Sequence, residues 1–144
     1  MKVVLDTDVV IAGLRSPTGA SAALLQRVLK GELSILVSVA LALEYEAICL
    51  LAEHRLAAGA SEDDFRNLLD ALLGKAIPVN VHYQWRPQLR DAADEMVLEA
   101  AVNGGAHAII SFNHRDYGAA PQRFGIQLLT PKDFLLEFLR KVRS

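Results

Sequence analysis

The sequence has little cysteine, few aromatic side chains and almost no net charge. Of its 144 residues one is a cysteine, Cys49, so the chain forms no internal disulfide, and its apolar neighbours predict a small buried side chain rather than a nucleophile. A formal net charge of −2 argues weakly against a protein that holds nucleic acid through a basic surface. It does not exclude an enzyme that cuts nucleic acid through bound cations, because the metal ions supply local positive charge.

Long apolar runs are also missing. The most apolar window, residues 35–52, is interrupted by Glu44 and Glu46 and predicts no transmembrane segment. Only one lysine and four apolar residues precede Asp6, too few for the apolar region of a signal peptide, so we expect a cytoplasmic protein. With 52% hydrophobic and 22% charged residues the composition is globular, and the length predicts one domain over residues 1–144.

Predicted strands and helices alternate along the whole chain. Short apolar runs predict strands at residues 2–5, 35–37, 77–81, 108–110 and 126–129. Apolar spacing, caps and terminal glycines predict helices at residues 9–14, 20–30, 39–54, 61–74, 91–103 and from Thr130 onward, with loops at residues 83–90 and 111–117. This order predicts a three-layer α/β/α fold, with a mostly parallel central sheet of four or five strands between two layers of helices.

Acidic residues follow two of the predicted strands directly. Asp6 and Asp8 come after the first strand, and residues 111–116 follow the strand at 108–110. Right-handed crossovers place the carboxyl ends of parallel strands at one edge of the sheet, where α/β proteins bind ligands. The helix that Asp94 opens would begin at the same edge. The alternative is that Asp6, Asp8 or Asp91 only caps a helix and that Asp94 only favours the helix dipole.

The predicted helix at residues 39–54 is apolar nearly all round, and Glu44 and Glu46 are the only charges in its middle. Both glutamates lie on apolar stripes, so periodicity does not choose between them. A carboxylate taken out of water needs a paired charge or a metal ion, and a buried glutamate here therefore predicts a cation. The alternative is that both side chains reach water at the edge of the helix.

Carboxylates that converge in one crevice repel each other and persist mainly where cations occupy it. Ligand sets made only of oxygen favour Mg²⁺ or Mn²⁺. Sites with two such ions activate a water molecule and stabilise the leaving oxygen of an in-line displacement at phosphorus. The acidic pattern therefore predicts phosphodiester hydrolysis.

Four motifs in order complete a known pattern. They are the acidic end of the first strand in Leu5-Asp6-Thr7-Asp8-Val9, Glu44 within Leu43-Glu44-Tyr45-Glu46, Asp94 at a helix start, and the run from Ser111 to Tyr117. With these motifs the chain resembles PIN-domain ribonucleases over essentially its whole length. Within that family it is similar to the VapC-like toxins of bacterial toxin–antitoxin pairs.

The resemblance implies an endoribonuclease that depends on Mg²⁺ or Mn²⁺ and cleaves single-stranded RNA. It implies a catalytic and metal-binding set of four acids: Asp6, Glu44, Asp94 and Asp116. Asp6 would be the central ligand, and Thr7 and Asn113 would support the substrate or the attacking water. The same resemblance favours Glu44 over Glu46 and Asp94 over Asp91.

The resemblance also implies partners, a second copy of the chain in a homodimer and a cognate antitoxin that the helix at residues 39–54 would accommodate. Two positions depart from the family pattern. Asp8 stands where the family often has asparagine, and it would add a ligand or only a cap. Arg115 would bring a cation to the phosphate or would pair with Asp116 and weaken its metal role.

Two other functions remain open at this level. Residues 6–10 also resemble the opening motif of haloacid-dehalogenase-type phosphatases, in which Asp6 would be the nucleophile and Glu44 would have no role. A catalytically degenerate PIN fold would serve as an RNA- or protein-binding module. Cleavage of RNA by the pure protein, with and without Mg²⁺ or Mn²⁺, separates the nuclease from the binding module.

Overall fold

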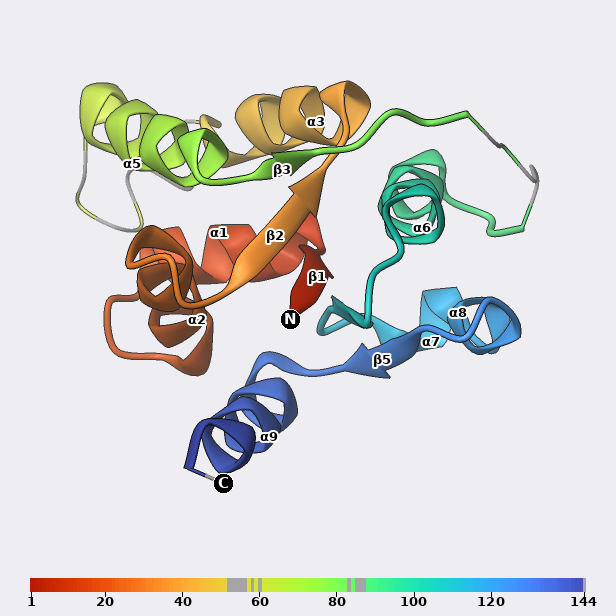
Figure 1. Cartoon of the computed structure of the whole chain (residues 1–144). Helices are drawn as coiled ribbons and strands as arrows, with labels where there is room; N and C mark the ends of the chain where they lie inside the picture. Colours follow the sequence, from red (N-terminus) through yellow and green to blue (C-terminus); the bar gives the residue numbers. More distant parts are fainter. Residues whose placement is uncertain (52–56, 58, 60, 83, 85–87, 144) are drawn as a thin grey trace.

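A computed structural model describes residues 1–51, 57, 59, 61–82, 84 and 88–143 (Figure 1). The last part of the predicted helix at residues 39–54 and half of the predicted loop at residues 83–90, including Trp85, lie outside the described residues. Among the described residues, no helix combines the length and the apolar character that crossing a membrane requires.

The core of the fold is a sheet of five parallel strands in the order β3-β2-β1-β4-β5. The strands are β1 (Lys2–Leu5), β2 (Ser34–Val37), β3 (Ile77–Pro78), β4 (Ala108–Ile110) and β5 (Gln127–Leu129). Val3 in β1 pairs with Ile35 on one side and Ala108 on the other, so β1 lies in the middle of the sheet. The parallel sheet predicted from the sequence is confirmed.

Helices flank both faces of the sheet. They are α1 (Thr7–Arg15), α2 (Ala20–Leu29), α3 (Val39–Cys49), α5 (Glu62–Gly74), α6 (Ala92–Gly104), α7 (His114–Tyr117), α8 (Ala120–Arg123) and α9 (Pro131–Arg143). Figure 1 shows α1, α2, α5 and α9 on one side of the strands and α6, α7 and α8 on the other. Buried strands and flanking helices together form the predicted α/β/α fold.

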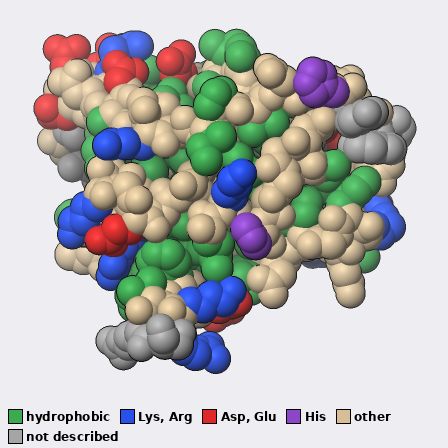
Figure 2. Space-filling model, in the orientation of Figure 1, with side chains coloured by type: hydrophobic (Ala, Val, Ile, Leu, Met, Phe, Trp, Pro, Cys, Tyr) green, Lys and Arg blue, Asp and Glu red, His purple; other side chains and the backbone are tan. Residues whose placement is uncertain are grey.

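Local sequence explains where the helices begin and end. Ser61 and Asp64 form a reciprocal capping box at the start of α5, as the spacing predicts. Acidic side chains fill the first turn of α5, and they gather at the upper left of Figure 2. Gly105 follows α6 with φ 66°, a left-handed conformation that glycine adopts without strain. The hydroxyl of Thr130 accepts from the backbone N–H of Asp133, which confirms the predicted cap of α9.

Two local predictions are wrong. The strand expected over residues 77–81 covers only Ile77–Pro78, although its place at the edge of the sheet is the one that proline favours. The loop expected over residues 111–117 contains the short helix α7, and α8 follows it. Each of these helices has four residues, too few for a helical period to appear in the sequence.

Tyr45 ties α3 to the central strand. Its side chain is fully buried, and its hydroxyl donates a hydrogen bond to the backbone carbonyl of Leu5. We expect Tyr45→Phe to lower the free energy of unfolding by about 1–2 kcal/mol, because it removes a buried hydrogen bond without opening a cavity. Urea denaturation followed by circular dichroism measures this change. An unchanged midpoint would show that the hydroxyl contributes nothing to holding α3.

Cys49, at the end of α3, is buried as the sequence predicts. It is 1% exposed, and burial raises the pKa of its thiol to about 12. A thiol with that pKa stays protonated at neutral pH and is a poor nucleophile. The prediction of a buried, unreactive cysteine is confirmed.

Candidate active site

The sheet brings Asp6 to the point where the strand order reverses. From β1 the chain continues to β2 and β3 on one side, whereas β4 and β5 lie on the other. Asp6 directly follows β1, and its backbone N–H donates to the carbonyl of Ile110 at the end of β4, at 2.9 Å. Open parallel sheets bind ligands in the crevice at this switch point. Asp6 and Ser111 therefore meet where the fold itself provides a site.

Asp6 is 7% exposed and accepts three hydrogen bonds. Oδ1 accepts from the backbone N–H of Thr7 at 2.7 Å, and Asp6 caps α1. Oδ2 accepts from the hydroxyl of Ser111 at 2.6 Å and from that of Tyr117 at 3.0 Å. The sequence left open whether Asp6 caps a helix or belongs to a site. In the structure it does both. These bonds fix the carboxylate in one orientation.

Asp8 lies in the first turn of α1, close to Asp6. Its Oδ2 accepts from the backbone N–H of Phe112 at 3.2 Å. Its Oδ1 is buried and has no hydrogen-bond partner in the described part of the chain. Burial, and then the negative charge of Asp6, raises the pKa of Asp8 to about 6. A cation bound beside Asp8 would stabilise the charged form of its carboxylate.

Asp94 faces the same crevice from the first turn of α6. It is 7% exposed, and within the described residues its buried Oδ2 has no hydrogen-bond partner. Burial raises the pKa of Asp94 to about 6, followed by the charges of Asp6, Asp91 and Asp116, while the hydroxyl of Tyr117 acts in the opposite direction. Asp91 caps α6 by accepting from the N–H of Ala93 at 2.8 Å. At the start of α6, Asp91 therefore caps the helix, whereas Asp94 is buried and keeps one oxygen without a partner among the described residues.

Asp116 is exposed on α7, at the rim of the crevice. The side-chain amide of Asn113 donates to its Oδ2 at 2.7 Å, and the backbone N–H of Asn113 donates to Ser111 at 2.9 Å. Ser111 therefore connects Asp6 with the segment that carries Asp116. In the described chain Arg115 forms no ion pair with Asp116, so the pairing considered from the sequence is not made.

Glu44 and Glu46 are both half-buried on α3. Between them on α3, Tyr45 donates to the carbonyl of Leu5, the residue before Asp6. The direct contacts of the site join Asp6 to the segment after β4. The role of Glu44 stays a prediction.

The carboxylate oxygens of the crevice suit a divalent cation that keeps some of its water ligands. Within the ranges that the structure describes, they do not form a complete set of protein ligands around one ion. No group of three or more His, Cys, Asp or Glu side chains among the described residues is arranged to hold one ion. Mg²⁺ needs no such group, because it keeps several waters and is usually held by one or two carboxylates. Asp8 and Asp94 each offer a buried oxygen that no group in the described part of the chain satisfies. Oxygen donors of this kind suit Mg²⁺ and Mn²⁺.

Sequence reasoning did not assign roles to Ser111 and Tyr117, which bind Asp6. Ser111 is fully buried and Tyr117 is 1% exposed. Burial, and then the charges of Asp6 and Asp94, raises the pKa of Tyr117 well above its usual value, so its hydroxyl remains a donor. Their position at the end of β4 was the available signal. Their contact with Asp6, more than a hundred residues away, is visible only in the fold.

A family model described as PIN domain matches residues 2–115. The chain belongs to the PIN domain family. PIN domains are generally nucleases, so the crevice lies in a fold that acts on nucleic acid. The matched segment of this PIN domain includes Asp6, Asp8, Glu44 and Asp94 and ends one residue before Asp116. A search of curated proteins gave no match.

Proposed function

We propose that this PIN domain is an endoribonuclease that cleaves single-stranded RNA and depends on Mg²⁺ or Mn²⁺. One observation carries the proposal. Two buried carboxylate oxygens, on Asp8 and Asp94, lack partners within the described residues beside a third carboxylate, Asp6, at the switch point of the sheet. Leaving such oxygens unsatisfied costs free energy, which a bound cation recovers.

In this proposal the catalytic and metal-binding acids are Asp6, Glu44, Asp94 and Asp116, with Asp8 as an added ligand. A divalent cation, when bound, supplies the charge that activates water and stabilises the oxygen leaving phosphorus. Ser111 and Tyr117 orient Asp6, and Asn113 orients Asp116 through its side-chain amide. Asn113 and Thr7 are also the proposed substrate contacts at the rim of the crevice.

Membership of the PIN family disfavours the phosphatase alternative. The hydrogen bonds of Asp6 do not separate the two functions. Oδ2 accepts from Ser111 and Tyr117, whereas Oδ1, within the described residues, accepts only from Thr7 and keeps a lone pair. In the nuclease this lone pair binds the cation, and in a phosphatase it would attack phosphorus.

We also propose that the nuclease is the toxin of a toxin–antitoxin pair and forms a homodimer. The support is an apolar surface on α3, where Val39 is 78% and Leu43 60% exposed. Leu68 on the neighbouring α5 is 37% exposed. Large apolar side chains exposed close together are typical of surfaces that bind protein. Light scattering of the purified chain measures whether it forms the dimer.

The cleavage assay that tests this function uses protein stripped of metal with EDTA. The protein is incubated with an end-labelled pool of single-stranded RNA, a matched duplex, or p-nitrophenyl phosphate, each with Mn²⁺, Mg²⁺ or EDTA. We expect internal cuts in single-stranded RNA only with a cation. Release of nitrophenol without RNA cleavage would instead support the phosphatase, and no reaction with any substrate would support a binding module.

Glu44 and Glu46 provide a matched pair for testing the acidic set. Both are half-buried on α3, and each becomes uncharged with little change of shape in Glu44→Gln or Glu46→Gln. We expect Glu44→Gln to lower the rate of RNA cleavage by about 10–100-fold, because a cation loses one ligand or supporting charge. Glu46→Gln should cut at the rate of the unchanged protein. Equal rates for both variants would remove Glu44 from the site.

A further inference from the structure

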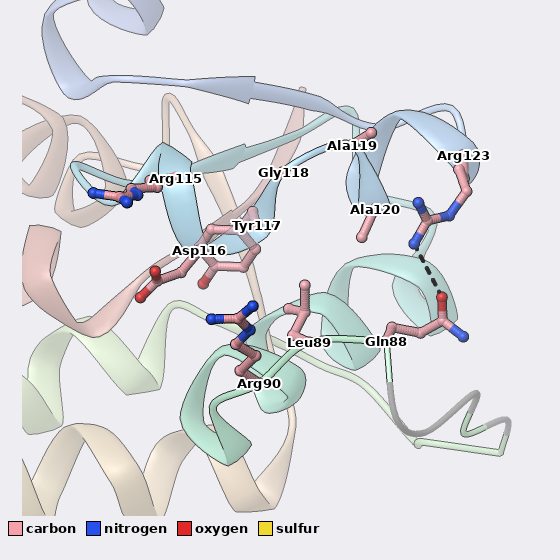
Figure 3. A pocket seen from close by; sticks show the side chains of 10 residues that line it. All are labelled: Gln88, Leu89, Arg90, Arg115, Asp116, Tyr117, Gly118, Ala119, Ala120 and Arg123. Carbon is pink, nitrogen blue, oxygen red and sulfur yellow. Dashed lines mark hydrogen bonds between the residues drawn. The ribbon is translucent and has the colours of Figure 1, made fainter.

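A groove of about 450 Å³ adjoins the acidic crevice on the side of α7 and α8. Asp116 stands at one end of it, and Gly118, Ala119 and Ala120 form part of its wall (Figure 3). Two of the residues that line the groove also reach the aspartates, because Tyr117 donates to Asp6 and the charge of Asp116 acts on Asp94. A nucleic-acid strand bound at the aspartates could therefore continue along this groove.

Three arginines line the groove, Arg90, Arg115 and Arg123. In Figure 3 the side chain of Arg115 points away from the other two. Arg90 extends from the loop before α6 toward Asp116 and Tyr117, and Arg123 points from α8 to the side chain of Gln88 (Figure 3). Arg90 and Arg123 are both exposed. Arg90 forms no ion pair with a carboxylate in the part of the chain that the structure describes. In a protein of net charge −2, this is a local concentration of positive charge beside acids.

The loop that carries Arg90 is held in place by a buried acid. Glu95, in the first turn of α6, is 5% exposed. Its Oε1 accepts from the backbone N–H groups of Gln88 and Leu89 at 2.6 and 2.7 Å. Gln88 in turn accepts from the guanidinium of Arg123 at 3.2 Å. One carboxylate thus holds the backbone of the two residues before Arg90, and through Gln88 it is connected to Arg123.

We infer that this groove binds the sugar–phosphate backbone of the RNA strand beyond the cleaved bond, with Arg90 and Arg123 contacting successive phosphates. The inference rests on the proposed ribonuclease function and adds the path that the strand takes. Guanidinium groups match phosphate oxygens in geometry and charge. The small residues of the wall let a backbone approach closely. Positive charge here also offsets the repulsion between the strand and the aspartates.

The residues of the groove favour backbone contacts over base contacts. Among the described residues that line it, Tyr117 is the one aromatic, and at 1% exposed it offers no surface for a base to stack on. Phosphate contacts position a strand but do not read its sequence. The groove should therefore add affinity equally for RNAs of different sequence and make binding sensitive to salt.

The test compares RNA binding by two arginine variants and a matched control. Arg90→Gln and Arg123→Gln are made singly and together, and Arg66→Gln serves as the control because Arg66 lies on α5 and pairs with Glu62. All carry Asp6→Asn, so that cleavage does not disturb the measurement. Fluorescence anisotropy of a labelled 12-nucleotide RNA gives Kd in EDTA between 50 and 200 mM KCl. Circular dichroism checks that each variant is folded.

Loss of two phosphate contacts should flatten the plot of log Kd against log salt by about 1.4, or about 0.7 for each contact with a single strand. We expect binding by the double variant to be about 5–20-fold weaker at low salt, and Arg66→Gln to bind as its parent does. An unchanged slope in the double variant would overturn the inference. An equal loss of affinity and slope in Arg66→Gln would also overturn the inference. The effect would then come from the total charge of the protein and not from the groove.

Cleavage by the same arginine variants with Asp6 intact separates the two proposals. If the protein with all its native residues cuts RNA and the double variant cuts with unchanged KM and salt dependence, the groove is wrong while the nuclease stands. If the native protein does not cut but the double variant loses affinity and slope, the nuclease is wrong while the groove stands as a nucleic-acid site. A flatter salt dependence of binding together with a raised KM in the double variant would support both the nuclease and the groove.

Discussion

Replacing Asp6 by asparagine is expected to reduce RNA cleavage by about 10³-fold or more without unfolding the protein. Asp6 is the carboxylate about which the crevice is built, and Asp6→Asn removes its charge while keeping its shape. Asparagine caps helices as well as aspartate does, so α1 keeps its start. An amide can also exchange hydrogen bonds with the hydroxyls of Ser111 and Tyr117. The loss should therefore fall on the chemistry and on the binding of cations.

The measurement is the initial rate of cleavage of single-stranded RNA with Mn²⁺ in excess, for the native protein and for Asp6→Asn. Circular dichroism and the urea midpoint of both proteins show whether the fold is kept. Asp63→Asn is the matched control, because Asp63 lies in the first turn of α5, away from the crevice. Cleavage by Asp6→Asn within a few-fold of the native rate would remove Asp6 from the mechanism.

Replacing Asp94 by asparagine is expected to change activity and stability in opposite directions. Cleavage should fall by about 10²–10³-fold, because the site loses one of its central charges. In the absence of metal, the free energy of unfolding at pH 8 should rise by about 1–2 kcal/mol. Repulsion from Asp6, Asp91 and Asp116, together with burial, disfavours the charged form of Asp94. Loss of its favourable interaction with the helix dipole, about 0.3–1 kcal/mol, is the smaller effect.

The pH dependence of this effect has a definite sign. The pKa of Asp94 is raised from 3.8 to about 6 in the folded chain, so the folded state binds its proton more tightly than the unfolded state does. Stability therefore falls as pH rises from about 4 to about 6, and the penalty is fully present above pH 6. Asp8, whose pKa is also raised to about 6, acts in the same direction. The metal-free native protein should lose this part of its stability between pH 4 and pH 6.

Urea denaturation in EDTA at pH 5 and pH 8 measures the effect for the native protein and for Asp94→Asn. The difference in unfolding free energy between the two proteins should be larger at pH 8 than at pH 5. Saturating Mn²⁺ should stabilise the native protein at pH 8 more than it stabilises the variant. A variant less stable than the native protein at pH 8 in EDTA would show that Asp94 is not under repulsion.

The sequence predicted the sheet and the place of Asp6 because the signals are local. A short β-branched run ends in Asp-Thr-Asp, and buried parallel strands are read from such runs directly. The helix caps at Ser61 and Thr130 were predictable for the same reason. The strand at Pro78 is shorter than the one predicted over residues 77–81. The two helices after β4 have four residues each and leave no period to detect.

The partners of Asp6 were not predictable in the same way. Ser111 and Tyr117 contact it across more than a hundred residues, and only the pairing of β1 with β4 brings them there. The spacing of apolar residues also could not show which of Glu44 and Glu46 faces the site, because α3 is apolar on every side. The arginine groove went unseen because it depends on Glu95, whose side chain binds a loop that composition describes only as polar.

The central claim is that the aspartates of the crevice bind a divalent cation used to cut RNA. Calorimetric titration of metal-free protein with Mn²⁺ at pH 6, in two buffers of different ionisation enthalpy, tests it most directly. We predict saturable binding with release of protons, because Asp8 and Asp94 have pKa values of about 6 and must lose their protons to bind metal. The same titration of Asp6→Asn should give little heat. No saturable binding by the native protein, or equal binding by Asp6→Asn, would contradict the account.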